Sequence, residues 1–386
     1  MPVPNKLVIF SGSLAVISLI IFISNRRLKY LRGKKKETAY LQYMNEQHII
    51  VHMVSETAYV TKGQGVHTAF LELAILLRED RHISIVLNNE GKGDIFHSHT
   101  YGPYYFWKGW TYKGRRVLTA HVIPDSIKGS LPLWRYLMPL ARQYFKMVYS
   151  YADAVIALSP TVERAIKDLG VKTKVVKIYN PVLTDSWVRT AENRVKGRKL
   201  LGIKDNETLI LGVGQLQERK GVEDFIDVAE AIPDARFVWV GGRPFGIFTE
   251  GIKRINSKIA NAASNIDFPG MQELEDMRFL YAAADIFLFP SYQENCPLAP
   301  LEAAASGIPV VFRDLNEYKS LYNHPYLKAV DTADFIKITT RLIKDKTYYD
   351  DAVKMSENLI KEFDKVKIRN EIIKLYNNLL VKYFKN

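Results

Sequence analysis

The segment PSYQENCPLAPLEAAASGIP, residues 290–309, decides the fold and the kind of site that we expect. The apolar runs at 284–289 and 309–312, on either side of it, are typical of buried strands. Between them we expect one helix, because proline is tolerated in a first helical turn and Gly307 fits the left-handed residue that ends a helix. A strand–loop–helix–strand unit of this kind puts a helix N-terminus at the carboxyl edge of a parallel sheet.

The start of this helix carries the chemistry. Backbone amides at a helix N-terminus are unpaired and lie at the positive end of the helix dipole, so they attract anions such as phosphate. Glu294 stands in the loop and Glu302 stands eight residues later in the helix, where carboxylates can accept hydrogen bonds from sugar hydroxyls. Either glutamate alone is more often a solvated surface residue, but anion-binding amides beside acceptor carboxylates suit a nucleotide sugar. The residues predicted to bind it at the helix start are Asn295, Cys296, Pro297 and Leu298.

Two further stretches put polar or small residues between a strand and a helix. Arg219 and Lys220 follow the apolar run 208–214 and precede a helical pattern, so we expect them at the carboxyl edge of the same sheet. Two cations there would neutralise a diphosphate and the charge that builds on it as a glycosidic bond breaks, although most Arg-Lys pairs are solvated turns. Gly63 and Gly65 would let the backbone approach a ligand closely, which is weak evidence by itself.

Three features occur together in and around the opening segment: Phe-Pro-Ser at 289–291, the Glu-x7-Glu spacing of Glu294 and Glu302, and AAASGIPVV at 303–311. With them the chain resembles the retaining GT-B glycosyltransferases of glycosyltransferase family four. The resemblance implies an α/β fold of two Rossmann-like domains, each with a doubly wound parallel sheet, that face a central cleft. It also implies a reaction on one face of the sugar in which the leaving phosphate helps to take the acceptor proton, so we name no enzymatic nucleophile.

The same resemblance assigns roles to residues outside that segment. His121, at the end of a predicted strand, would lie near the donor sugar, and Gly63-Gln64-Gly65 stands where the family has a glycine pair. Lys220 matches the family's Lys-Gly, whereas Gln215 stands where many members have arginine, so Arg219 is the expected substitute. The predicted catalytic residues are therefore His121, Arg219, Lys220 and Glu294, and the predicted donor-binding residues are Gly63, Gly65, Asn295, Cys296, Pro297, Leu298 and Glu302.

No metal or other cofactor is expected besides a UDP-sugar as donor substrate. The sequence DIFHSH at 94–99 has two histidines on the same side of a strand, which is one pattern for metal ligands. No third ligand at a suitable spacing is evident, so we interpret the pattern as a structural or substrate-lining strand end. The chain has no Asp-x-Asp motif, which metal-dependent glycosyltransferases use, and no nucleophile elbow, Walker loop or cysteine pair.

The chain has 386 residues, of which 47% are apolar and 25% charged, and this composition favours a globular protein of two domains. We predict an anchor with a basic run at 1–36, an acceptor-side domain at 37–185 and a nucleotide-sugar domain at 200–350. Helices at 351–386 would pack back on the first domain. The polar sequence from Asn180 to Arg198 is interpreted as the linker. A single cysteine rules out an intrachain disulfide and favours a reducing compartment.

The N-terminus predicts membrane attachment. Residues 7–24 carry no charge and are long enough to span the hydrocarbon if flanking residues contribute. A signal peptide would have its charges before the apolar run, so we favour an uncleaved single-pass anchor with the catalytic part in the cytoplasm. Much of the net charge of +13 lies in the next eleven residues, which suits anionic lipid rather than nucleic acid. These cations are Arg26, Arg27, Lys29, Arg32, Lys34, Lys35 and Lys36.

A second lipid signal lies at 129–146, where tryptophan and tyrosine alternate with arginine and lysine. Such a helix can lie among the headgroups of an anionic phospholipid surface, but an ordinary amphipathic helix covering the sheet gives the same pattern.

Within family four, four segments resemble bacterial diacylglycerol and monoglucosyl-diacylglycerol glucosyltransferases. We therefore predict a membrane-associated retaining hexosyltransferase that moves glucose or galactose from a UDP-sugar to one of these lipids. The alternatives are a polyprenyl-linked or polysaccharide acceptor, a nucleotide-sugar epimerase on the same fold, and a non-catalytic binding module. The segments are 53–55 with 62–66, 121–131, 214–225 and 241–246.

Overall fold

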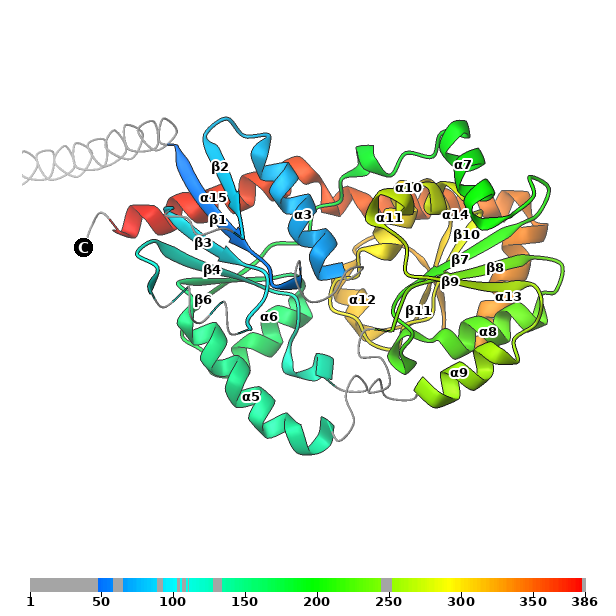
Figure 1. Cartoon of the computed structure of the whole chain (residues 1–386), viewed down its shortest axis with the longest axis horizontal. Helices are drawn as coiled ribbons and strands as arrows, with labels where there is room; N and C mark the ends of the chain where they lie inside the picture. The colour runs from blue at the N-terminus through cyan, green and yellow to red at the C-terminus, as the bar shows by residue number, and fades with distance from the viewer. Residues whose placement is uncertain are drawn as a thin grey trace, which may run out of the picture. The chain divides into compact units, whose positions relative to one another are not determined.

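The computed structural model describes residues 48–57, 65–88, 93–102, 105, 109, 111–127, 134–243 and 252–383 (Figure 1). Gly63, the apolar stretch 7–24, the basic run 26–36 and the first part of the aromatic segment 129–146 lie outside these residues. Within the described residues the chain folds into two halves, each built on one six-stranded sheet.

The first half of the chain forms a six-stranded sheet in the order β2-β1-β3-β4-β5-β6. From β1 to β6 each pair of neighbours is parallel. Parallel neighbours need crossover connections, and helices supply them here. The elements are β1 (Ile49–Val54), α3 (Gly65–Arg78), β2 (Ile83–Leu87), β3 (Ile95–Ser98), β4 (Arg115–Ala120), η1 (Pro124–Ile127), α5 (Trp134–Tyr151), β5 (Ala154–Ala157), α6 (Pro160–Lys167) and β6 (Lys174–Lys177).

The second half forms another six-stranded sheet, in the order β12-β11-β10-β7-β8-β9, and all its pairs are parallel. Read from β9, this is the 3-2-1-4-5-6 order of dinucleotide-binding folds. The elements are β7 (Leu209–Val213), η3 (Glu218–Lys220), α8 (Val222–Ala231), β8 (Arg236–Val240), α9 (Ile252–Ala260), β9 (Ile266–Gly270), α10 (Leu274–Ala283), β10 (Ile286–Phe289), α11 (Ala299–Ala305), β11 (Val310–Arg313), α12 (Asn316–Leu321), β12 (Leu327–Ala329) and α13 (Thr332–Lys344).

Strand order identifies where ligands are expected. In each sheet the order reverses between two neighbouring strands, β1 and β3 in the first sheet and β7 and β10 in the second. The connections that leave the carboxyl ends of such a pair run in opposite directions and leave a crevice between them. The loops after β1, β3, β7 and β10 therefore flank these two crevices. The prediction of two doubly wound parallel sheets is confirmed.

The segment 290–309 forms the expected loop and helix. Pro300 lies in the first turn of α11, where its missing N–H leaves no hydrogen bond unmade. Gly307, just beyond the helix, has φ of +71°, which a side chain would disfavour. The helix is buried along Leu301, Ala303 and Ala304, so it is held against the sheet and its N-terminus is fixed in direction.

The polar stretch that the sequence suggests as a linker contains a helix, α7 (Ala191–Leu201), after a short η2 (Thr184–Ser186). It packs on α10 through Gly197, where an added Cβ would lie 1.9 Å from the carbonyl oxygen of Phe279. Arg198 is 2% exposed, and its guanidinium donates to Asp285 at 2.7 Å. A close backbone approach and a buried ion pair hold this helix, which an apolar pattern cannot reveal.

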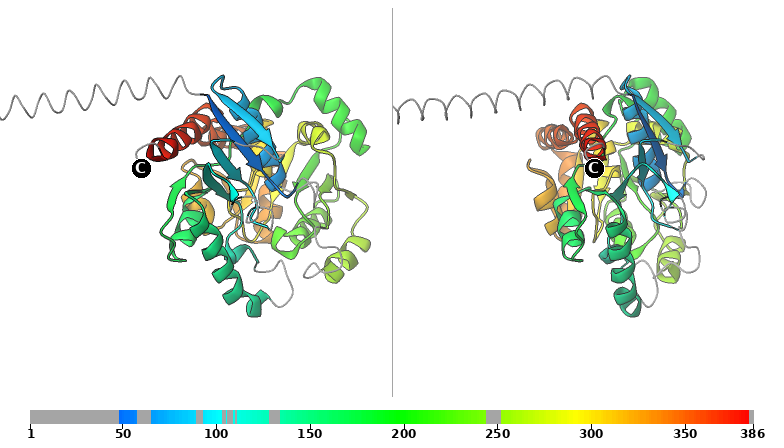
Figure 2. Two further views of the ribbon diagram at one scale, coloured as in Figure 1. Left: turned by 60° about the vertical axis from the view of Figure 1, so that its left-hand side comes forward. Right: turned by 90° about the vertical axis from the view of Figure 1, so that its left-hand side faces the viewer.

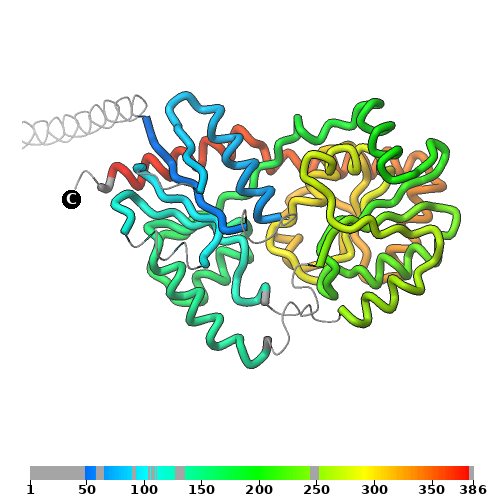
Figure 3. The backbone as a smooth tube through the Cα atoms, in the orientation of Figure 1, coloured from blue at the N-terminus to red at the C-terminus, as the bar shows by residue number. Residues whose placement is uncertain are grey.

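After α14 (Lys346–Ile360) and η5 (Lys361–Phe363), the chain ends in α15 (Lys365–Tyr383). The tube in Figure 3 follows the chain from β1 in blue to this helix in red. Figure 2 shows α15 beside the strands of the first sheet from two further directions. The hydroxyl of Tyr376 lies 2.6 Å from His97 Nδ1 on β3, and Arg369 forms an ion pair of 2.7 Å with Glu79.

The prediction of a membrane-spanning helix is wrong for the part of the chain that the structure describes. The predicted localisation, a single-pass anchor with the catalytic part in the cytoplasm, depends on that helix and is wrong with it. A span needs about 20 mostly apolar residues. The helices that approach this length, α5 and α15, each carry several charged residues. Among residues 48–383, where described, no helix combines the required length and apolar character.

Candidate active site

A cavity of about 590 Å³ lies where the carboxyl ends of the two sheets meet. From the first sheet it is lined by the start of α3 and by the residues after β4. From the second sheet it is lined by the residues after β7, β8, β9 and β10. These are loops at the strand-order reversals and their neighbours, so the fold puts a ligand-sized space where doubly wound sheets bind ligands.

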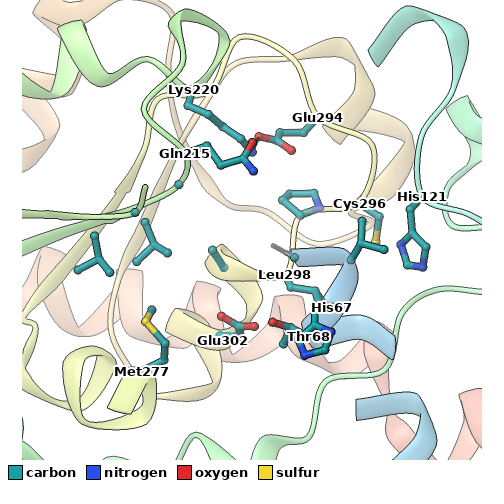
Figure 4. Close-up of a pocket in the computed structure, with 18 of the residues that line it drawn as sticks. His67, Thr68, His121, Gln215, Lys220, Met277, Glu294, Cys296, Leu298 and Glu302 are labelled. Carbon is teal, nitrogen blue, oxygen red and sulfur yellow. Dashed lines mark hydrogen bonds and ion pairs between the residues drawn. The ribbon is translucent and has the colours of Figure 1, made fainter. Parts of the chain in front are cut away.

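The structure brings the predicted residues together in this one cavity. Glu294 and Lys220 lie beside each other, and Glu302 is drawn apart from them (Figure 4). Gly63 lies outside the described residues. The predicted residues that line the cavity are Gly65, His121, Arg219, Lys220, Glu294, Asn295, Cys296, Pro297, Leu298 and Glu302.

Lys220 and Glu294 form an ion pair, with Nζ 2.5 Å from Oε1. The side chains are 14% and 8% exposed, so the pair is mostly removed from water. Burial lowers the pKa of Lys220, the Glu294 charge raises it and Arg219 lowers it. The sequence suggests that the cation and the carboxylate bind different ends of a ligand, whereas the structure puts them in direct contact.

The two loops that carry this pair are locked together. Gly221 has φ of +71°, and a Cβ there would lie 2.3 Å from the carbonyl oxygen of Pro290. The backbone amide of Tyr292 donates to the carbonyl of Arg219 at 2.8 Å. Arg313, which is buried, donates to the Pro290 carbonyl at 2.8 Å. Backbone contacts thus fix the distance between the turn after β7 and the loop after β10.

Arg219 is directed by its neighbours rather than by a carboxylate. Its Nε donates to Gln217 at 3.0 Å, and Nη1 lies 3.4 Å from the carbonyl oxygen of Gln293. The guanidinium and the Lys220 ammonium share the cavity wall. Two cations next to one carboxylate leave an excess of positive charge that suits a bound anion.

Glu302 lies in a different environment from Glu294. It is 7% exposed, and its Oε2 accepts a hydrogen bond of 2.6 Å from the Tyr281 hydroxyl. Burial raises the pKa of Glu302 to about 7. Burial, and then the charge of Glu302, raises the pKa of Glu72 on α3 well above its usual range. The ribose or sugar hydroxyls of a ligand would give the Glu302 carboxylate the hydrogen bonds that water cannot reach to supply.

Asn295 links the two halves of the chain across the cavity. Its Nδ2 donates to the His121 carbonyl and to Ser126 Oγ, both at 3.0 Å. Ser126 lies in η1, so the loop after β10 is bound to the segment after β4. Next to it, burial raises the pKa of Cys296 to about 12, which keeps the thiol protonated and unreactive at neutral pH.

His121 lies on the first-sheet side of the cavity. Burial lowers its pKa to about 3, so the imidazole is neutral at physiological pH. A neutral ring offers one N–H donor and one acceptor nitrogen. It can therefore hydrogen-bond a sugar oxygen without adding charge to the site.

Some cavity residues were not predicted from the sequence. Gly214 and Gly241 lie so close that a Cβ on Gly241 would be 1.8 Å from the Gly214 carbonyl oxygen. Because both residues are glycines, no side chain of theirs covers the backbone beside the turn of Lys220. The glycines that end β7 and β8 are a signal that could have identified them. Tyr281 and Asn180 also line the cavity and carry no local motif.

His97 and His99 resemble a pair of metal ligands in the sequence. In the part of the chain that the structure describes, no group of three or more His, Cys, Asp or Glu side chains could hold a metal ion.

Comparison with known proteins identifies the family. The family description "Glycosyltransferase Family 4" matches residues 46–186, and "Glycosyl transferases group 1" matches residues 207–345. Alpha-galactosylglucosyldiacylglycerol synthase of Streptococcus pneumoniae is 33% identical over 328 residues, which are 83% of this chain and 84% of that protein. The chain belongs to glycosyltransferase family 4. The glycosyltransferase is therefore a hexose-transferring enzyme with the GT-B fold, as predicted.

Two further comparisons extend the match. Processive diacylglycerol alpha-glucosyltransferase of Acholeplasma laidlawii is 29% identical over 245 residues, 63% of the glycosyltransferase and 71% of that protein. The crystal structure of Anabaena Alr3699/HepE in complex with UDP and glucose superposes with a TM-score of 0.69 at 18% identity. It covers 86% of this chain and 100% of that chain, and supports the fold.

Proposed function

We propose that the glycosyltransferase moves glucose or galactose from a UDP-sugar to diacylglycerol or monoglucosyl-diacylglycerol, with retention at the anomeric carbon. The observation that carries this proposal is the cavity that holds Arg219, Lys220, Glu294 and Glu302 together. Its volume of about 590 Å³ falls in the range of roughly 300–1,000 Å³ that small-molecule sites occupy.

Each end of the cavity suits one part of the donor. Arg219 and Lys220 would neutralise the diphosphate and the charge that develops on it when the glycosidic bond breaks. Glu302, deep beside Tyr281, would accept hydrogen bonds from the ribose hydroxyls. Glu294 and His121 would contact the hexose, so that its anomeric carbon faces the space between the two sheets.

The acceptor proposal is supported by the names of the two relatives, which both act on diacylglycerol lipids. It is also supported by α5, which packs on η1 beside the cavity. This helix exposes large apolar side chains next to Arg142 and Lys146. A mixed apolar and cationic face suits an anionic phospholipid surface. The exposed apolar side chains are Tyr136, Leu137, Leu140, Tyr144 and Met147.

One assay tests the reaction. Purified protein is incubated with labelled UDP-glucose or UDP-galactose together with diacylglycerol, glucosyl-diacylglycerol or no acceptor. We expect label in the organic phase only with a lipid acceptor, and none with Lys220→Ala or Glu294→Ala. Label in another nucleotide sugar would instead identify an epimerase, and no label in the organic phase with either lipid would overturn the diacylglycerol assignment.

Sedimentation with vesicles of phosphatidylglycerol tests the lipid face. Leu140 on α5 is 71% exposed and Ile75 on α3 is 51% exposed, so each tolerates a charge without loss of core packing. We expect Leu140→Asp to weaken vesicle binding while Ile75→Asp leaves it unchanged. Equal binding of both variants would exclude α5 as the lipid-contacting helix.

A further inference from the structure

Three histidine rings form a continuous stack from the interior of the first sheet to the cavity. His97 lies on β3, His99 follows this strand, and His121 follows β4. The ring centroids of His97 and His99 are 4.7 Å apart, and those of His99 and His121 are 5.1 Å apart. Of the three, His121 lines the cavity. The stack therefore connects the buried sheet with the donor site.

The inner end of the stack is held rigidly. His97 Nδ1 lies 2.6 Å from the Tyr376 hydroxyl on α15, and its Nε2 lies 2.7 Å from Thr119 Oγ1 on β4. Both ring nitrogens are thus hydrogen-bonded, and the ring is completely buried. Because His97 cannot turn, it gives His99 a fixed surface to pack on. The ring of Phe70 also packs edge-on against His99, with the centroids 5.4 Å apart.

His99 and His121 share one hydrogen bond, with Nδ1 of His99 3.0 Å from Nε2 of His121. Burial keeps the pKa of both rings far below neutral, so both are uncharged and a single proton lies between them. The other nitrogen of His99, Nε2, is buried and has no hydrogen-bond partner within the described part of the chain. The two possible positions of the shared proton therefore differ in what they leave at Nε2.

If His121 donates this bond, His99 carries its proton on Nε2 as a buried N–H without an acceptor. If His99 donates it, Nε2 keeps only a lone pair. Orphaned buried N–H groups are rarer in proteins than under-satisfied acceptors, so the second arrangement is favoured. In that arrangement the proton of His121 lies on Nδ1. His121 is partly exposed and lines the cavity, so water or a ligand can accept a hydrogen bond from this N–H, whereas neither can reach the buried Nε2 of His99.

We propose that His99 is a positioning residue that holds His121 in the Nδ1–H tautomer, so that His121 presents an uncharged N–H donor to an oxygen of the donor hexose. The identity of that ligand rests on the proposed function, whereas the tautomer does not. The donor sugar must therefore place an oxygen that accepts a hydrogen bond next to Nδ1 of His121.

The tautomer is measured directly on the full-length protein labelled with ¹⁵N-histidine. Long-range ¹H–¹⁵N correlation separates protonated from bare ring nitrogens, and the His121→Gln spectrum assigns the signals. We expect protonated Nδ1 and bare Nε2 for His121 without ligand, unchanged from pH 6 to 8. A protonated Nε2 on His121 would overturn the proposal even if the enzyme transfers hexose as proposed.

Kinetics test whether the tautomer matters. His99→Asn keeps an N–H donor near Nδ1, whereas His99→Leu removes it. Loss of a preorganised donor costs about 10²–10³ in kcat, and loss of its orientation alone costs less. We expect His99→Leu to lower kcat roughly tenfold with a smaller change in donor KM, and His99→Asn to recover most of it.

The melting temperature of each variant is compared with that of His324→Asn, which changes a solvent-exposed histidine. Equal kcat for His99→Leu, His99→Asn and wild type would exclude the positioning role. A wild-type protein without any hexose transfer would instead refute the proposed function, while the ¹⁵N spectrum would still decide the tautomer.

Discussion

Replacement of Lys220 by methionine removes one partner of the Lys220–Glu294 ion pair and keeps the length of the side chain. Glu294 is then left 8% exposed without its counter-charge. Removing one partner of a buried pair typically costs about 3–5 kcal/mol, because the remaining charge is uncompensated. At about 2–4 °C per kcal/mol for a domain of this size, the melting temperature should fall by roughly 10 °C.

The double variant Lys220→Met/Glu294→Gln removes both charges. Replacing a buried pair by neutral groups of similar volume is often neutral or stabilising, so we expect the unfolding free energy to return to within about 1 kcal/mol of wild type. Hexose transfer should remain absent in both variants. Stability would thus recover while activity does not, which separates the structural from the catalytic role of the pair.

In the single variant Glu294→Gln the remaining lysine can release its proton, so the loss of stability should depend on pH. Burial already lowers the pKa of Lys220, and loss of the carboxylate lowers it further. The folded protein then binds fewer protons than the unfolded chain, so stability rises with pH and the loss shrinks toward pH 9.

The assay is urea unfolding followed by circular dichroism, with the exposed pair Lys354–Asp351 as control. Lys354→Met should change the unfolding free energy by about 1 kcal/mol or less. A double variant as unstable as Lys220→Met, or a Lys220→Met variant as stable as wild type, would show that the ion pair does not have the assigned effect on stability.

Three other predictions concern the cavity. Burial raises the pKa of Glu302 to about 7, so the folded protein binds this proton more tightly than the unfolded chain does. The stability of the protein should therefore fall from pH 5 to 8. In thermal melts, Glu302→Gln should reduce this dependence on pH. Gly221→Ala should lower kcat/KM at least about 100-fold by displacing the Lys220 turn, whereas Gly202→Ala, with φ of +67° and open space, should keep wild-type kinetics. Asn295→Ala loses both hydrogen bonds across the cavity and should raise donor KM, whereas Asn193→Ala, outside the cavity, should leave it unchanged.

Each of these has an outcome that contradicts it. The pH prediction fails if wild type and Glu302→Gln show parallel pH slopes. The glycine prediction fails if the alanine variants at 221 and 202 behave alike. The prediction for Asn295 fails if Asn295→Ala binds the UDP-sugar with wild-type affinity in calorimetry.

Local pattern was enough to predict the parts of the fold that are set by neighbouring residues. The loop and helix of 290–309, with Pro300 in the first turn and Gly307 after the last, follow from backbone preferences that act over a few residues. Strands such as β1, β7 and β10 are largely apolar runs. Because parallel strands end at the same edge, Lys220 and Glu294 could be expected in one cavity although 74 residues separate them.

Contacts made by tertiary packing were not predictable in this way. Tyr376 and His97 are 279 residues apart, and no pattern in either segment indicates the other. The helix α7 can be polar because it is held in place by the close contact of Gly197 with α10 and by the ion pair of the buried Arg198 with Asp285. The strand β12 has only three residues, too few for a periodic signal.

We expect one donor molecule to span both the cations after β7 and the carboxylates of the 290–309 segment. A crystal structure with bound UDP-glucose tests it most directly. The diphosphate should lie against Arg219 and Lys220, the ribose hydroxyls on Glu302, and the hexose between Glu294 and His121. A nucleotide bound outside this cavity, or bound inside it with Glu302 and Lys220 both out of hydrogen-bonding distance, would contradict this binding mode.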